Sequence, residues 1–125
     1  METEKKLIML VDDNPANLRI GKNVLSEKYT VATAPSAAKL FSLLEKNDPA
    51  AILLDIDMPE MDGYETIQIL KSKPETKDIP VIFLTGLGNS QDEAKGRALG
   101  AVDYIVKPFN PPVLFSCIEK TLKNR

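Results

Sequence analysis

Five side chains that can bind metal ions or phosphate stand in the same sequence context, directly after a short apolar run. They are Asp12, Asp13, Asp55, Thr85 and Lys107. A carboxylate can attack phosphorus as a covalent nucleophile, and clustered carboxylates suit Mg²⁺, which prefers hard oxygen ligands. A lysine ammonium and a threonine hydroxyl can both donate hydrogen bonds to phosphoryl oxygens. These residue types therefore suit magnesium-assisted phosphoryl transfer, provided that the fold brings them together.

The apolar runs before these residues have the length of strands, and helical patterns separate them. We expect strands near residues 7–11, 29–33, 50–55, 79–84 and 101–106. Helices are expected after Asn14, after Ser36, from about 62 to 71, from the loop at 86–90 to Gly100, and from about Pro112. Strands that alternate with helices predict a parallel sheet with right-handed crossovers and helices on both faces.

The expected fold class is α/β, with one doubly wound (βα)5 domain over residues 1–125 and the flavodoxin-like strand order 2-1-3-4-5. In that order, the strand before Asp12 and Asp13 neighbours the strand before Asp55, at the point where open sheets bind ligands. Three carboxylates would then share one crevice. Two like charges about 4 Å apart repel by roughly 4 kcal/mol at a surface-like dielectric. Such a cluster requires a cation, and magnesium best fits its oxygen ligands.

The segment 50–63 is the centre of this prediction. Its unbroken apolar start is typical of a strand buried on both faces of a parallel sheet, and Asp55 lies where that strand ends. Pro59 ends the extended stretch because it has no N–H for the ladder, and Gly63 permits close backbone approach where the next helix begins. Asp55 is therefore the predicted reactive residue.

The composition excludes several other kinds of site. The sequence has no histidine, which excludes zinc sites built on imidazole and Ser-His-Asp catalysis. A net charge of -2 gives no electrostatic footprint for direct nucleic-acid binding. No apolar segment approaches the roughly 18 residues of a membrane span. A single cysteine, Cys117, and a charged start unlike a secretory signal fit a cytoplasmic protein.

Four blocks of the sequence resemble the response-regulator receiver domain, the CheY-like family of two-component signalling. The blocks are Val11–Asn14, Leu54–Gly63, Leu84–Gly86 and Tyr104–Phe109. They occur in the family's order and spacing, and the resemblance covers essentially the whole chain. One such block would be a weak signal, but the four together are highly specific.

The resemblance implies a role for each acidic residue. Asp55 is the expected phosphoacceptor and one of the ligands of Mg²⁺. Asp13 is expected to bind the ion directly, and Asp12 largely through water. Asp57 is expected to contribute its backbone carbonyl.

The resemblance also implies how the site and the signal are connected. Lys107 pairs with the phosphoryl group, and its bond to Pro108 is expected to be cis. Thr85 then moves toward a phosphoryl oxygen, and Tyr104 turns inward with it. The surface of the fourth helix, fifth strand and fifth helix carries the signal to an output domain or effector protein. A homodimer through that surface is a further expectation.

The resemblance implies that the phosphoryl donor is a sensor histidine kinase or a histidine phosphotransfer protein. The chain has no histidine of its own, so the phosphoryl group must come from another molecule. A small donor such as acetyl phosphate is the other source. On this interpretation the protein is a signalling switch that promotes its own phosphorylation and dephosphorylation. It is not expected to be an enzyme that turns over a separate metabolite.

Two other function classes share parts of this pattern. Asp55-Ile56-Asp57 fits the Asp-x-Asp signature of a haloacid-dehalogenase-like phosphatase. However, Pro59 stands where that family usually carries Thr or Val, and the chain lacks room for a cap domain. A flavodoxin-like cofactor binder would share the fold, but its first loop must hold a phosphate that Asp12 and Asp13 would repel. Turnover of simple phosphate esters or a coloured purified protein would favour these alternatives.

Overall fold

The computed structural model describes residues 5–86, 90–107 and 110–123. Over these residues, five strands alternate with five helices. The elements are β1 (Leu7–Val11), α1 (Pro15–Leu25), β2 (Thr30–Ala34), α2 (Ala37–Leu44), β3 (Ala51–Asp55), α3 (Gly63–Ser72), β4 (Val81–Thr85), α4 (Ser90–Ala98), β5 (Asp103–Val106) and α5 (Pro111–Lys123). No described helix has both the length and the apolar character that crossing a membrane requires.

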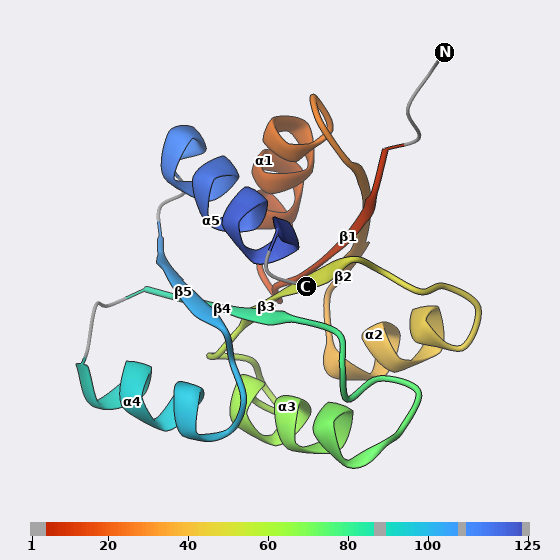
Figure 1. The fold of residues 1–125 in the computed structure, drawn as a ribbon, viewed down its shortest axis with the longest axis vertical. Coiled ribbons are helices and arrows are strands. Elements are labelled where there is room, and N and C mark those ends of the chain that lie inside the picture. Colours follow the sequence, from red (N-terminus) through yellow and green to blue (C-terminus); the bar gives the residue numbers. More distant parts are fainter. Residues whose placement is uncertain (1–4, 87–89, 108–109, 124–125) are drawn as a thin grey trace.

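The strands form one parallel sheet in the order β2-β1-β3-β4-β5, as the sequence predicts. Helices α1 and α5 cover one face of the sheet, and α2, α3 and α4 cover the other (Figure 1). The register of β1 and β3 sets Val11 beside Leu54, so the residues that follow them lie at the same end. The protein therefore has the doubly wound, flavodoxin-like α/β fold, with its switch point between β1 and β3.

The apolar runs form strands because the sheet buries them on both faces. All five residues of β3 and all five of β4 are buried. Successive side chains enter opposite cores. Ile52 and Leu54 pack on the side of α2, α3 and α4, whereas Leu53 packs on the side of α1 and α5. Each such side chain stabilises the fold by about 1.5 to 3 kcal/mol relative to leaving it exposed.

Polar caps fix where three of the helices begin. The side chains of Asn14 and Ser36 accept backbone hydrogen bonds from the first turns of α1 and α2, as predicted. Asp62 and Glu65 form a capping box, in which each side chain accepts a hydrogen bond from the other residue's backbone N–H. Helix α3 therefore begins at Gly63, one residue later than predicted, because Asp62 is its cap.

The other boundaries differ from the predictions by one or two residues. β4 begins at Val81, two residues late, because Pro80 has no N–H to donate to the ladder. β2 runs one residue later than predicted, from Thr30 to Ala34, and α5 begins one residue earlier, at Pro111.

The connection from α4 to β5 differs from the prediction by two residues at each end. Helix α4 ends at Ala98, and Gly100 follows with a φ of 114°, the left-handed conformation common after helix ends. The Ala101 N–H then donates to the Gly96 carbonyl at 3.0 Å. Because Ala101 completes the helix end in this way, β5 starts only at Asp103.

Candidate active site

The three predicted carboxylates, Asp12, Asp13 and Asp55, meet at the carboxyl ends of β1 and β3. One carboxylate oxygen of each residue lies within 4.8 Å of the other two. Asp12 and Asp55 are 0% and 2% exposed, whereas Asp13 is exposed to solvent. Because the donors are hard oxygens and the cluster meets solvent at Asp13, it suits a cation such as Mg²⁺ that keeps several of its waters.

Lys107 follows β5, and its ammonium pairs with both buried carboxylates. The Lys107 Nζ lies 2.9 Å from Asp12 Oδ2 and 3.2 Å from Asp55 Oδ1. Burial disfavours the charge on Lys107, but the hydrogen bonds and attraction of Asp12 and Asp55 outweigh it and raise the pKa of the amine. The ammonium is thus held in its charged form beside the predicted phosphoacceptor, where it can neutralise phosphoryl oxygens.

Asp55 titrates unusually for an aspartate. Burial, together with repulsion from Asp12, raises the pKa of Asp55 to about 6, although Lys107 acts in the opposite direction. One oxygen of Asp55 also accepts a 3.2 Å hydrogen bond from the Asp57 backbone N–H. A carboxyl group perturbed by both burial and a like charge is typical of functional sites.

Asp12 is held by protein donors on both of its oxygens. Oδ1 accepts the Asn14 backbone N–H at 2.9 Å, and Oδ2 accepts the Asn17 side-chain amide at 3.1 Å in addition to Lys107. The sequence analysis did not identify Asn17 as a site residue. Its position in the first turn of the helix after the acidic pair was the signal that could have found it. These contacts leave the exposed Asp13 as the carboxylate most accessible to an incoming ion.

Thr85 and Asp57 lie at the same end of the sheet as Asp55. Thr85 is buried at the end of β4, and its carbonyl accepts the Lys107 backbone N–H at 2.7 Å. Asp57 follows β3. Its backbone N–H donates a hydrogen bond to the Asp55 carboxylate, and its side chain is exposed. Both residues are therefore at the predicted end of the sheet. The bond from Lys107 to Pro108, predicted to be cis, lies outside the described residues.

Tyr104 belongs to a row of aromatic rings on the face of the sheet that α3 and α4 cover. Its ring is 6.2 Å from that of Phe83 on β4, and Phe83 is 5.6 Å from Tyr64 of α3, both in edge-on contact. Lys95 of α4 places its ammonium 4.2 Å from the centre of the Tyr64 ring. The sequence analysis identified only Tyr104, because a row assembled from three elements leaves no local pattern.

Two glycines let helices pack closely beside the site. A Cβ at Gly63 would lie 2.7 Å from the Asp55 carbonyl oxygen and 2.8 Å from the Ile56 Cα, which confirms the predicted close approach. A Cβ at Gly96 would lie 2.6 Å from the Phe83 ring and 3.2 Å from the Tyr104 ring. Helix α3 therefore starts directly against the end of β3, and α4 rests on the aromatic row.

Comparison with known proteins identifies the response regulator receiver domain family, which matches residues 8–119. A probable cyclic di-GMP phosphodiesterase of Vibrio cholerae is 43% identical over 118 residues, which are 94% of this chain and 27% of that protein. The probable transcriptional regulator ycf27 of Cyanophora paradoxa is 40% identical over 124 residues, which are 98% of this chain and 51% of that protein. The chain thus spans between about a quarter and a half of the length of these relatives.

A solved structure with the same fold bears on the acidic cluster. The receiver domain of a sensor histidine kinase from Pseudomonas aeruginosa aligns with a TM-score of 0.86 and 26% identity, over 95% of this chain and 98% of that one. That structure has a magnesium ion coordinated in its active-site cleft. Receiver domains bind Mg²⁺ at an aspartate cluster, and Asp12, Asp13 and Asp55 form such a cluster here. Neither a phosphatase nor a cofactor binder finds support in these matches.

Proposed function

Because the chain belongs to the response regulator receiver domain family, we propose that Asp55 is the residue that accepts its phosphoryl group. The observation that carries this proposal is the shared contact of Lys107 Nζ with Asp55 Oδ1 at 3.2 Å and Asp12 Oδ2 at 2.9 Å. Through this contact, the Lys107 ammonium is held beside the Asp55 carboxylate, which is the proposed nucleophile. Asp12 and Asp55 together form a carboxylate pair that suits a metal ion. Phosphoryl transfer depends mainly on positioning and charge neutralisation, and this arrangement supports both.

The proposed reaction forms one bond and breaks one. An oxygen of ionised Asp55 attacks phosphorus, while the bond from phosphorus to the donor breaks and its electron pair leaves with the donor. The donor atom is a phosphohistidine nitrogen of a partner protein or the acetate oxygen of acetyl phosphate, since these 125 residues include no histidine. The product is an aspartyl phosphate, which adds a charge of about -1.5 to -2.

Magnesium is the proposed cofactor of this step. Asp12, Asp13, Asp55 and the backbone carbonyl of Asp57 would hold it, because their oxygens match its preference for hard ligands. When bound, the ion supplies charge neutralisation for the phosphoryl oxygens. We assign direct contact to Asp13 and contact through water to Asp12, since both Asp12 oxygens already accept hydrogen bonds from the protein.

The proposed switch starts from the same residues. Lys107 neutralises the new phosphoryl oxygens, the Thr85 hydroxyl donates a hydrogen bond to one of them, and Tyr104 turns inward as Thr85 moves. The burial of Thr85 beside Lys107 and the contact of Tyr104 with Phe83 support this coupling. A shift of the ratio of switched to unswitched protein from 1:99 to 99:1 requires about 5.5 kcal/mol of differential stabilisation. The interactions of the new phosphoryl charge with Lys107 and Thr85 must supply it.

The proposed output surface consists of α4, β5 and α5, and it contacts an output domain, an effector protein or a second copy of the chain. Val106 of β5 and Val113 of α5 support this role, because they are 50% and 54% exposed and exposed apolar side chains are common at interfaces. Residues 1–125 then act as one receiver domain, a switch without a metabolite substrate. The phosphodiesterase activity in the name of the Vibrio relative is ascribed to that protein and is not part of this proposal. A cytoplasmic histidine kinase or histidine phosphotransfer protein is the proposed donor.

Mass spectrometry of the purified protein after treatment with acetyl phosphate and Mg²⁺ tests this function. We expect the mass of one added phosphoryl group, which is lost in Asp55→Asn. Asp48→Asn should keep it, because this exposed aspartate lies in the loop before β3 and serves as a matched control. Chelation of Mg²⁺ and Asp13→Asn should both suppress the added mass. An unmodified wild-type protein, or full modification of Asp55→Asn, would contradict the proposal.

A further inference from the structure

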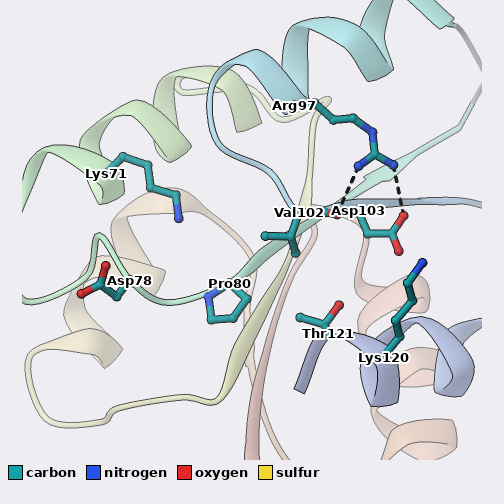
Figure 2. Close-up of a pocket in the computed structure, with 8 residues that line it drawn as sticks. All are labelled: Lys71, Asp78, Pro80, Arg97, Val102, Asp103, Lys120 and Thr121. Carbon is teal, nitrogen blue, oxygen red and sulfur yellow. Dashed lines mark hydrogen bonds and ion pairs between the residues drawn. The ribbon is translucent and has the colours of Figure 1, made fainter. Parts of the chain in front are cut away.

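A second charged cavity lies at the amino end of the sheet, opposite the aspartate cluster. It has a volume of about 300 Å³. Pro80, just before β4, and Val102, just before β5, lie between Lys71 of α3 and Lys120 of α5 (Figure 2). A cavity of this size is at the lower limit of pockets that hold small organic ligands.

Positive side chains outnumber negative ones around this cavity. Three cations, Lys71, Arg97 and Lys120, line it together with two carboxylates, Asp78 and Asp103. Arg97 Nη2 lies 3.4 Å from Asp103 Oδ1, so these two charges offset each other. Arg97 Nε also pairs with Glu93, outside the lining, at 3.3 Å, so Lys71 and Lys120 are the cations that can meet a ligand with a single negative charge.

Lys71 has the clearest capacity to bind such a ligand. Its ammonium has three N–H donors, and within the described part of the chain it donates to the carbonyls of Lys77 at 3.0 Å and Ile79 at 3.2 Å. Its methylene groups pack beside Gly100, where a Cβ would lie 3.1 Å from Lys71 Cε, so the side chain is held in place. Burial lowers the pKa of Lys71, and an adjacent anion would offset that penalty.

Apolar surface adjoins these charges within the cavity. Val102 is 46% exposed although it is apolar, and it shares the cavity wall with Pro80 and the side chain of Thr121. Ligand sites commonly combine such apolar walls with a few polar groups that orient the ligand. We propose that the cavity binds a small organic monocarboxylate, with its carboxylate on the Lys71 ammonium and its apolar body against Pro80 and Val102. This site does not depend on phosphorylation of Asp55.

An NMR titration of the whole chain, labelled with nitrogen-15, tests the site with benzoate as the probe. We expect saturable shifts of the Lys71, Val102 and Thr121 amides. Benzylamine has a similar ring and the opposite charge, so it should bind at least about tenfold more weakly, a factor that corresponds to 1.4 kcal/mol.

Three variants locate the binding. Lys71→Met keeps the methylene groups and removes the ammonium, so benzoate should bind at least about tenfold more weakly. Lys120→Gln changes an exposed side chain, whose charge water screens, and should weaken binding about threefold. Lys22→Gln, on exposed α1 surface, is the matched control and should bind as the wild type does. No saturable shift, shifts confined to other residues, equal binding of benzylamine, or unchanged binding in both cavity variants would overturn the proposal.

Discussion

The two ends of the sheet differ in how deeply their charged side chains are buried and in how these charges are paired. At the carboxyl end, Asp12 and Asp55 are almost fully buried and share a single lysine, so negative charge remains in excess. At the amino end, Arg97 and Asp103 form their ion pair with 46% and 27% of their side-chain surface exposed. The charges at the amino end are partly exposed to solvent or donate to backbone carbonyls, whereas the carboxyl end needs a further positive group or a proton for balance.

This difference supports the proposal that the chemistry takes place at the carboxyl end. Exposed ion pairs contribute about 0 to 1 kcal/mol, because water already solvates both partners. Removing one partner of a buried pair costs about 3 to 5 kcal/mol, because the remaining charge has no substitute for water. An arrangement that leaves buried charge unbalanced is therefore expensive, and such arrangements concentrate at functional sites.

The largest effect should come from Lys107→Met, which leaves Asp12 and Asp55 buried without their cation. The free energy of unfolding should fall by about 3 to 5 kcal/mol in metal-free buffer near neutral pH. Urea denaturation followed by circular dichroism measures this change. Added Mg²⁺ should recover part of the loss. A loss below about 1 kcal/mol would mean that the two ends of the sheet do not differ.

Asp55→Asn should stabilise the metal-free protein near neutral pH. Folding raises the pKa of Asp55 to about 6 from an ordinary value of 3.8. The folded state therefore holds a proton that the unfolded chain releases, and the stability from this group is present below pH 3.8 and lost as the pH rises through about 6. The substitution should add up to about 3 kcal/mol at neutral pH and little at about pH 4. Urea denaturation across this range checks it, and a gain independent of pH would count against the assigned cause.

Gly63→Ala should disturb the carboxyl end through the backbone. The new methyl group would meet the Asp55 carbonyl oxygen at 2.7 Å and the Ile56 Cα at 2.8 Å, and backbone atoms cannot rotate away. Overpacking of this kind costs about 1 to 3 kcal/mol, and phosphorylation of Asp55 by acetyl phosphate should slow as well. Gly86→Ala is the matched control, because a Cβ there meets nothing within 4 Å. Similar losses in the two variants would contradict the steric explanation.

The smallest effect is expected at the amino end. Arg97→Gln removes the ion pairs with Glu93 and Asp103, in which the arginine side chain is 46% exposed. The free energy of unfolding should fall by less than about 1 kcal/mol, and added salt should reduce the difference further. A loss as large as that of Lys107→Met would remove the distinction between the two ends.

The sequence was sufficient for the fold and for most of the candidate site because both depend on local pattern. Apolar runs of strand length, each ending in a polar residue, indicated where the carboxyl ends would lie. Asp12, Asp13, Asp55 and Lys107 then had to meet, since parallel strands end on one side of the sheet. The starts of three helices could likewise be predicted to within one residue, because a cap acts within one turn. The capping residues are Asn14, Ser36 and Asp62.

The features that the sequence did not reveal depend on three-dimensional contacts that residue types and spacing do not specify. The Asn17 amide reaches Asp12 only because the first turn of α1 folds back over the end of β1. The early end of α4 depends on the left-handed Gly100 and on the bond from Ala101 to Gly96. The cavity at the amino end draws on α3, α4, β5 and α5, so no continuous motif marks it.

The contact of α4 with the aromatic row has a mechanical consequence. Residues 93–95, 97 and 98 of this helix are exposed, whereas Gly96 is buried against the Phe83 and Tyr104 rings. Because α4 has so little apolar surface, the rings beneath it set the distance between the helix and the sheet. Rotation of one of those rings would therefore lower or tilt the helix, and the absence of a single methyl group at position 96 allows the helix to follow.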